Sequence, residues 1–319
     1  MSEPGVPQRF LDLAAAARAP KALSIGSLRT RFGDPTEMQV SVGQVWRARW
    51  EETSLLVLVL AIAAREVHAV PVTIDPPGED AASLVVDGAR TAFGVESTVW
   101  AGLAGPVPLR VLDRVVDAWE SDLVTWAAET AVGEPSPVPP GARQGVIPMS
   151  VFDVSEEVRA ELEDDLEALR SAPGLPAATG TEKVAALAAL LSGPPDLPAL
   201  GTALGVPQPE VMRILRGLVP LKPEQVEAVA GVTGLPVDAV AKTVRPLPAA
   251  LVAAVEHPRW RETWIRRAQR SGISEGDARL FGGYGAFALA ARQTGGEEPD
   301  WEGRLQQFLH GEGPSGSER

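Results

Sequence analysis

The spacing of apolar residues changes from that of strands in the first third of the chain to that of helices in the remainder. Residues 54–60 form a continuous aliphatic and β-branched run of strand length, and residues 67–72 form another. Shorter runs occur at residues 40–46, 84–86, 97–100 and 108–112, and residues 76–78 interrupt the pattern with prolines and a glycine. Several short strands at regular spacing predict a small, curled antiparallel sheet or barrel.

Helical spacing appears at residues 10–17 and again over residues 112–131, and we expect both segments to form helices. On one side of the second lie Val115, Val116, Trp119, Leu123 and Trp126. The acidic stretch of residues 153–167 accompanies an apolar stripe made by Val158, Leu162, Leu166 and Leu169. Its carboxylates are therefore predicted to form the solvated face of a helix and not a cation site.

The segment of residues 197–243 has the layout of a helix, a glycine turn and further short helices. Leu197, Leu200 and Leu204 share one face of a short helix that ends at Gly205, where a left-handed residue permits a sharp turn. A second helix is predicted over residues 208–216, and Gly201 is small enough to let the two helices approach closely. Two more short helices follow. This is the layout of a helix-turn-helix.

The run from Leu200 to Gly217 resembles the helix-turn-helix of the Cro/repressor (XRE-like) family, and residues 237–240 resemble its closing helix. The resemblance implies binding to double-stranded DNA. It places Gln208, Met212 and Arg213 on the groove-facing side of the recognition helix, and Arg216, Lys222 and Lys242 near phosphates. Glu210 favours an alternative, a small bundle used only for protein contacts, because phosphate repels a carboxylate.

The order of the predicted strands resembles the MazF/PemK-like barrel of toxin–antitoxin systems. The resemblance rests on residues 42–46, 55–60, 70–73, 94–100 and 111–115. It implies RNA cleavage by an arginine just before the second strand and a threonine or serine after the third. Thr73 matches the second position, but residues 51–54 hold no arginine. Arg47 and Arg49 on the preceding strand could substitute for it, but we interpret the barrel as a degenerate module for sensing or interaction, with RNA cleavage as the alternative.

Charge is distributed unevenly along the chain. A net charge of −13 and an isoelectric point near 4.8 argue against non-specific coating of nucleic acid. Residues 245–292, however, carry eight arginines against four acidic residues. Any nucleic-acid face should therefore lie in the C-terminal half, where Arg266 and Arg267 could contact flanking phosphates.

Other candidates for chemistry have no supporting pattern. The three histidines, His68, His257 and His310, are scattered without the spacing of a metal site or a catalytic triad, so we expect no metal and no cofactor. The absence of cysteine excludes disulfides. Residues 282–285 contain three glycines but lack the preceding strand and the lysine of a phosphate loop, which indicates a flexible or closely packed helix.

The fold class predicted is α+β, with a small N-terminal barrel followed by an all-helical domain. Residues 1–134 are predicted to form the barrel that resembles the MazF/PemK-like family, with flanking helices, and residues 135–150 are predicted to be a proline-rich linker. Residues 151–310 form the helical domain with the helix-turn-helix at 197–243, and residues 311–319 are a disordered tail. The longest apolar run, residues 55–64, is too short to span a bilayer, so a soluble cytoplasmic protein without membrane contact is expected.

Together these patterns predict a sequence-specific transcriptional regulator that binds double-stranded DNA as a homodimer. Its N-terminal barrel would contact another protein or sense a ligand. Two alternatives remain open: an endoribonuclease toxin fused to its own repressor domain, and a non-enzymatic adaptor that binds other proteins.

Overall fold

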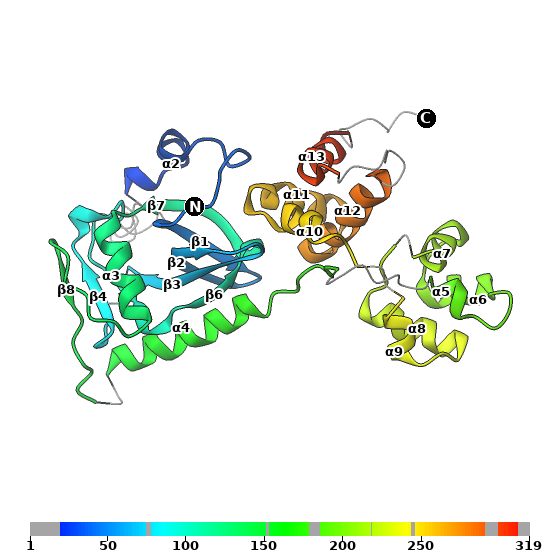
Figure 1. The fold of residues 1–319 in the computed structure, drawn as a ribbon, viewed down its shortest axis with the longest axis horizontal. Helices are drawn as coiled ribbons and strands as arrows, with labels where there is room; N and C mark the ends of the chain where they lie inside the picture. Colours follow the sequence, from blue (N-terminus) through cyan, green and yellow to red (C-terminus); the bar gives the residue numbers. More distant parts are fainter. Residues whose placement is uncertain are drawn as a thin grey trace, which may run out of the picture. The chain divides into compact units, whose positions relative to one another are not determined.

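The computed structural model of the 319-residue chain describes residues 20–74, 78–150, 153–178, 186–217, 219–243, 246–290 and 299–311. The chain divides into two compact units, Met1–Ala172 and Pro173–Arg319. The first is built on an antiparallel sheet and the second is helical (Figure 1). This agrees with the predicted α+β class. The helix predicted at residues 10–17 and the predicted tail after Gly311 lie outside the described residues.

The first unit contains an eight-stranded sheet in which each strand pair is antiparallel. The strands are β1 (Gln44–Trp50), β2 (Thr53–Ile62), β3 (Glu66–Thr73), β4 (Ser83–Val86), β5 (Ser97–Trp100), β6 (Gly105–Pro108), β7 (Leu112–Ala118) and β8 (Ala142–Gln144). Their order is β7-β1-β2-β3-β5-β4-β8, and β6 pairs with β3. The path has two ends, so the sheet does not close into the predicted barrel.

Helices of the first unit flank this sheet. They are η1 (Lys21–Leu23), α2 (Ile25–Phe32), η2 (Gly88–Arg90), η3 (Ala101–Leu103), η4 (Leu109–Val111), α3 (Ser121–Ala131) and α4 (Val154–Arg170). The 112–131 segment was predicted to be one helix, and its first part is instead strand β7. Val115 pairs with Trp46 of β1, a long-range contact that helical spacing alone does not reveal.

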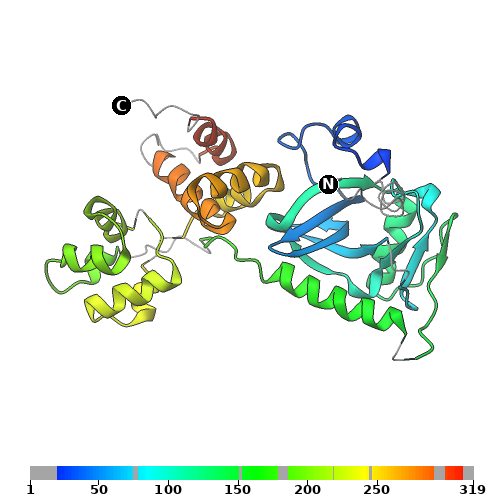
Figure 2. The same ribbon diagram turned by 180° about the vertical axis from the view of Figure 1, so that it is seen from behind.

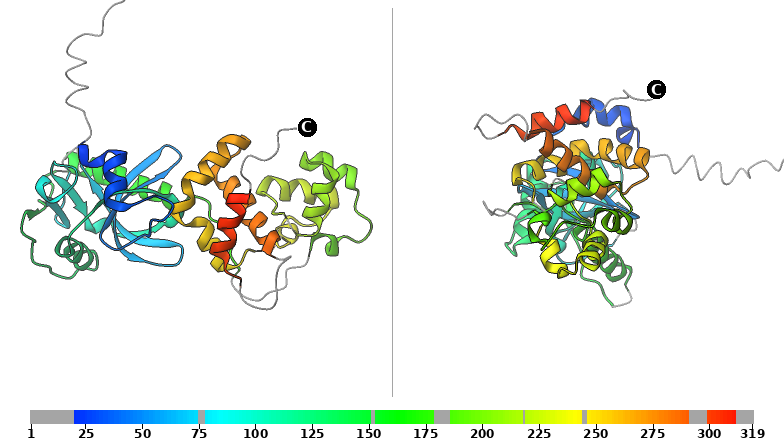
Figure 3. Two further views of the ribbon diagram at one scale, coloured as in Figure 1. Left: turned by 90° about the horizontal axis from the view of Figure 1, so that it is seen from above. Right: turned by 90° about the vertical axis from the view of Figure 1, so that its right-hand side faces the viewer.

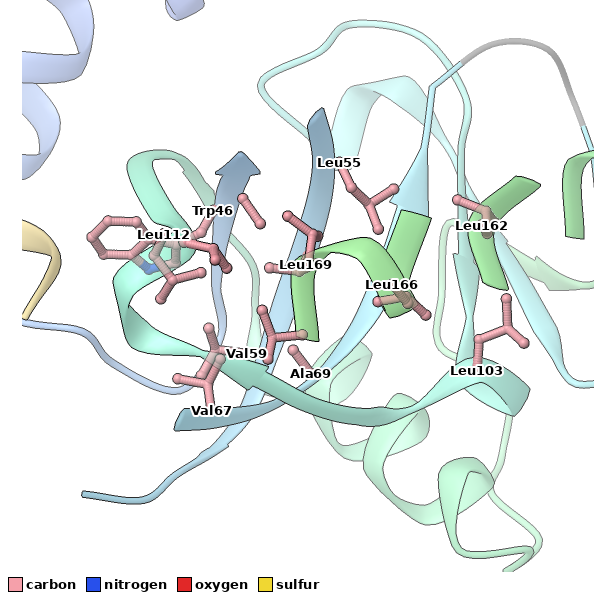
Figure 4. Packing of buried hydrophobic residues seen from close by; sticks show 14 of the residues in the cluster. Trp46, Leu55, Val59, Val67, Ala69, Leu103, Leu112, Leu162, Leu166 and Leu169 are labelled. Atoms are coloured by element: carbon pink, nitrogen blue, oxygen red, sulfur yellow. The ribbon is translucent and has the colours of Figure 1, made fainter. Parts of the chain in front are cut away.

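Helix α4 covers one face of the sheet. Its stripe of Val158, Leu162, Leu166 and Leu169 is buried in one cluster with strand residues such as Trp46. Figure 4 shows Leu162, Leu166 and Leu169 beside strand residues of this cluster. We call this cluster the α4 core. Figures 1 and 2, which view the protein from opposite sides, show this helix lying along the sheet. The stripe was predicted correctly, but it packs on the sheet and not within the second, helical unit.

Hydrogen bonds join both ends of α4 to the rest of the first unit. Arg159 Nη1 donates to Asp80 Oδ2 at 3.1 Å, and Arg170 Nε donates to the carbonyl of Pro106 at 3.2 Å. Just beyond the helix, Arg110 Nε donates to the carbonyl of Ala172 at 3.0 Å. The division between the units therefore falls after Ala172, whereas the predicted linker at residues 135–150 lies inside the first unit. Residues of that segment form β8, which extends the sheet beside β4.

Helix α3 contributes to a second cluster, on the other face of the sheet, which we call the α3 core. It joins Leu123 and Trp126 of α3 to Val45, Leu58 and further buried residues of the strands. Beside it, the buried carboxylate of Asp117 accepts hydrogen bonds from Arg31 Nη2 at 2.6 Å and from Trp119 Nε1 at 3.0 Å.

The second unit is helical over its described residues. The helices are α5 (Leu187–Leu190), α6 (Leu197–Leu204), α7 (Gln208–Leu215), α8 (Pro223–Thr233), α9 (Val237–Ala241), α10 (Ala249–Glu256), η5 (Pro258–Trp260), α11 (Arg261–Ser271), α12 (Glu275–Ala290) and α13 (Trp301–Gly311). Two apolar clusters organise them, one within α5–α9 and one within α10–α13. In Figure 3 the first group runs from green to yellow and the second from gold to red. None of the described helices combines the length and hydrophobicity of a membrane span.

The three glycines of residues 282–285 lie in α12 and allow close packing. A Cβ atom at Gly282 would lie 2.3 Å from Trp264 Cζ3, and one at Gly285 would lie 2.7 Å from Phe308 Cζ. Trp264 is fully buried, so its ring has little room to move. The segment is therefore a closely packed helix, which is one of the two alternatives, flexible or closely packed, that the sequence predicted.

His257 titrates outside its ordinary range because it is largely buried between α10 and η5. Its pKa is lowered from 6.5 to about 4, chiefly by burial and then by the nearby charge of Arg259, while Glu302 opposes the shift. The unfolded chain takes up the proton below pH 6.5, but the folded chain does so only near pH 4. This residue therefore makes the free energy of unfolding decrease as the pH falls from 6.5 to 4.

We expect His257→Asn to reduce that pH dependence. Nδ1 of His257 accepts a hydrogen bond from the backbone N–H of Arg259 at 3.3 Å, and an asparagine oxygen can accept the same bond without titrating. Urea unfolding at several pH values between 6.5 and 4 measures the difference between the two proteins. Parallel pH profiles would contradict this assignment.

Candidate nucleic-acid interface

Helices α6 and α7 form the two arms of the predicted helix-turn-helix. Asp196 Oδ1 caps α6 by accepting from the N–H of Ala199 at 3.0 Å. The helix ends at Gly205, whose φ of 64° is left-handed, as predicted. The chain restarts as α7 after Pro207, with Pro209 in the first turn, where no helical hydrogen bond is lost.

The two arms approach each other at Gly201. A Cβ atom there would lie 3.1 Å from the carbonyl oxygen of Val206 and 3.8 Å from Val211 Cγ2. Only a residue without a side chain leaves this contact unstrained, which confirms the predicted role of Gly201. The apolar sides of both arms share one core with α5, α8 and α9, through Leu187, Leu200, Leu204, Val211, Ile214, Leu215, Val226, Val229 and Val240.

The opposite side of α7 faces solvent. Gln208, Arg213 and Arg216 are exposed, as the DNA-reading interpretation requires. Met212 is half buried and packs against the α5–α9 core, so only part of its side chain faces outward. Arg213 and Arg216 are three residues apart and are therefore neighbours on the helix surface.

A carboxylate of the same helix already contacts Arg213. Its Nη1 atom lies 2.9 Å from Glu210 Oε2, and half of the Arg213 side chain is exposed. An exposed pair of this kind contributes little to stability, so the guanidinium can exchange Glu210 for another acceptor at small cost.

Lys222 and Lys242 have different surroundings. Lys222 Nζ lies 2.7 Å from Asp277 Oδ2 and 5.7 Å from the ring centroid of Phe281, both on α12. Its ammonium group is thus paired within the protein, and the predicted phosphate contact stays a prediction. Lys242 directly follows α9 and is exposed.

Arg266 and Arg267 lie on α11, whose core is separate from that of α7. The exposed Arg266 has its Nε 3.8 Å from Glu262 Oε1, and Arg267 stacks over the ring of Phe308 at 5.1 Å. The eight residues predicted to contact DNA therefore do not lie on one helix face. Six belong to residues 208–242 and two to α11.

Several arginines of residues 245–292 are buried or form ion pairs within the protein. Arg261 and Arg279 are buried, and both pair with Glu275. Arg259 pairs with Glu302. Arg245 and Arg292 lie outside the described residues. The arginine excess in the sequence therefore overstates the positive charge available at the surface.

The residues predicted for RNA cleavage lie on opposite faces of the sheet. Residues paired across antiparallel strands point to the same face. Arg47 is opposite Leu56, which is opposite Val72 of the α3 core. Thr73, the next residue, points to the other face, where Trp100 Nε1 donates to its Oγ1 at 3.0 Å.

The arginines of β1 also differ in their partners. Arg47 Nε donates to Asp113 Oδ2 at 2.7 Å, whereas the exposed Arg49 is paired in the ladder with Ser54. The structure therefore does not bring either arginine beside Thr73.

Within the described ranges, no group of histidine and acidic side chains is arranged to hold a metal ion. The residues that sequence reasoning missed are Asp277 and Phe281, which hold Lys222. No spacing in the sequence connects them, because α8 and α12 are far apart along the chain. No model of a known protein family matches this chain, and a search of curated proteins finds no match to it.

Proposed function

We propose that this protein is a sequence-specific DNA-binding regulator of transcription, with α7 as its reading helix and the sheet unit as a sensing or interaction module. The observation that carries the proposal is the pair of helices α6 and α7, joined by left-handed Gly205. Their apolar sides are buried together, and Arg213 of α7 and Arg216, which directly follows it, are exposed to solvent.

Charge within the α5–α9 group supports base reading more than phosphate binding. Residues 187–243 contain four basic and five acidic residues, and Lys222 is already paired. Because neutralised phosphates supply most non-specific affinity, we expect that affinity to be low. Specific binding then depends on contacts of Gln208, Arg213 and Arg216 with base edges or nearby phosphates.

Arg213→Ala is expected to lower affinity for the preferred site by about 5- to 150-fold, the range for loss of one bidentate contact to guanine. It should also relax the preference at one position of the site. The preferred site is first selected from a random pool of duplexes with the full-length protein, and dissociation constants are then measured at fixed salt. A palindromic site with half-sites one helical turn apart is expected for a homodimer.

Arg266→Ala is the matched comparison. As a phosphate contact it should weaken all duplexes equally and reduce the salt slope by about one. Selection that enriches no sequence would overturn the proposed function and favour a protein-binding adaptor. An unchanged dissociation constant for Arg213→Ala on an enriched site would show that α7 is not the recognition helix.

The RNA-cleaving alternative has a separate test. Because Thr73 and Arg47 point to opposite faces of the sheet, incubation with RNA is expected to leave it intact. Discrete cuts that disappear in Thr73→Ala would favour the toxin.

A further inference from the structure

A groove of about 320 Å³ opens beside the first arm of the helix-turn-helix. It lies between the segment that precedes α6 and the C-terminal end of α8. Apolar side chains of Leu191, Leu200, Val232 and Leu235 contribute to its wall, and Leu200 is almost fully buried. The volume is at the lower end of the range for small-molecule sites.

Two features make the groove electronegative. The carboxylate of Asp196 lines it, and only Oδ1 is engaged, by the N–H of Ala199; among the described residues Oδ2 has no hydrogen-bond partner. Helix α8, eleven residues long, ends at Thr233 on the same groove. The last turn of a helix carries partial negative charge on its carbonyl groups. Among the described residues, no lysine, arginine or histidine lines the groove to offset these charges.

We infer that the groove binds a small organic cation with an apolar body. Its ammonium group would lie near Asp196 and the end of α8, and its body would contact Leu200, Val232 and Leu235. The available volume fits a body of about one six-membered ring. An anion would meet the Asp196 carboxylate, and a neutral molecule would gain only the apolar contacts.

The position of the groove connects an occupant to α6. Asp196 both lines the groove and caps the first turn of that helix. A cation held there adds to the interactions that fix the start of the first arm. The inference does not rest on DNA binding, because occupancy can be measured on the protein alone.

Three probes of similar shape and different charge test the inference: cyclohexylammonium, cyclohexanol and cyclohexanecarboxylate. Each is titrated into the full-length protein while backbone amide signals are followed by NMR. Cyclohexylammonium is expected to shift the signals of Asp196, Leu200 and Thr233 with a dissociation constant on the order of 1 mM. It should bind about tenfold more tightly than cyclohexanol, and the carboxylate should bind most weakly.

Two variants separate charge from shape. Asp196→Asn keeps a good helix cap but removes the charge, so it should remove most of the preference for cyclohexylammonium over cyclohexanol, and the end of α8 accounts for the rest. Val232→Trp should fill the groove and weaken both probes. Asp238→Asn, at an exposed acid of α9 outside the groove, should change neither. Equal binding of the three probes, an unaffected Asp196→Asn variant, or shifts confined to other residues would overturn the inference.

Discussion

A fragment of residues 20–172 is expected to fold, whereas a fragment that ends at Gln144 is expected to remain unfolded. The shorter fragment lacks α4 and therefore exposes one face of the sheet. Val158, Leu162, Leu166 and Leu169 are all buried in the α4 core. Four such side chains contribute on the order of 6–12 kcal/mol at about 1.5–3 kcal/mol each, which is comparable to the whole stability of a domain.

Circular dichroism and urea unfolding of the two fragments measure this difference. A matched pair in the longer fragment keeps the chain length constant: Leu166→Asp should unfold it, and Asp164→Ala, on the solvated side of α4, should leave it folded. Limited proteolysis of the full chain is expected to cut after Ala172 rather than within residues 135–143. A cooperative unfolding transition in the fragment that ends at Gln144 would show that α4 is dispensable.

Removal of the Glu275 carboxylate is expected to destabilise the second unit by about 3 kcal/mol, the lower end of the cost of breaking a buried ion pair, because Glu256 still offsets part of the charge of Arg279. Glu275 Oε1 lies 2.6 Å from Arg279 Nη2 and 3.3 Å from Arg261 Nε, and both arginines are almost fully buried. Burial also lowers the pKa of Arg279, since the interior disfavours its charged form.

Urea unfolding of Glu275→Gln, which keeps the size of the side chain, measures this loss. Glu262→Ala is the control, because Glu262 faces solvent and its pair with Arg266 spans 3.8 Å. Exposed pairs of this kind contribute about 0–1 kcal/mol. Equal losses in the two variants would show that the two arginines do not depend on Glu275.

The elements that local chemistry controls could be predicted from the sequence. The turn at Gly205 needs a left-handed residue, and glycine adopts this conformation without strain. Residues 197–204 and 208–215 form helices close to the predicted ranges, and β5 has the predicted bounds. Each of these predictions depends only on residues that are near neighbours in the chain.

Predictions that depend on distant partners were less successful. Val115 and Val116 occur in a pattern that also fits a helix, but pairing with β1 makes that segment a strand. The stripe on α4 fits any apolar surface of suitable shape, so the sequence could not show that the sheet is its partner. The prolines of residues 135–140 indicated a linker, although the following residues pair with β4.

The candidate site shows the same division. Exposure of Gln208, Arg213 and Arg216 follows from the spacing of apolar residues in α7. The ion pair of Lys222 cannot be predicted from such spacing, because its partner Asp277 is 55 residues away in the chain. Burial of Arg261 and Arg279 depends likewise on the packing of α11 against α12 and not on their own neighbours in the chain.

Lys222 joins two helical groups, since it precedes α8 and pairs with Asp277 in the first turn of α12. Phe281, one turn further along α12, packs against the α5–α9 core. A rearrangement of α6–α9 that breaks the Lys222 pair therefore also removes a contact of α12. Thermodynamic reciprocity then applies: if DNA bound at α7 alters affinity for a partner at α12, that partner alters affinity for DNA by the same factor.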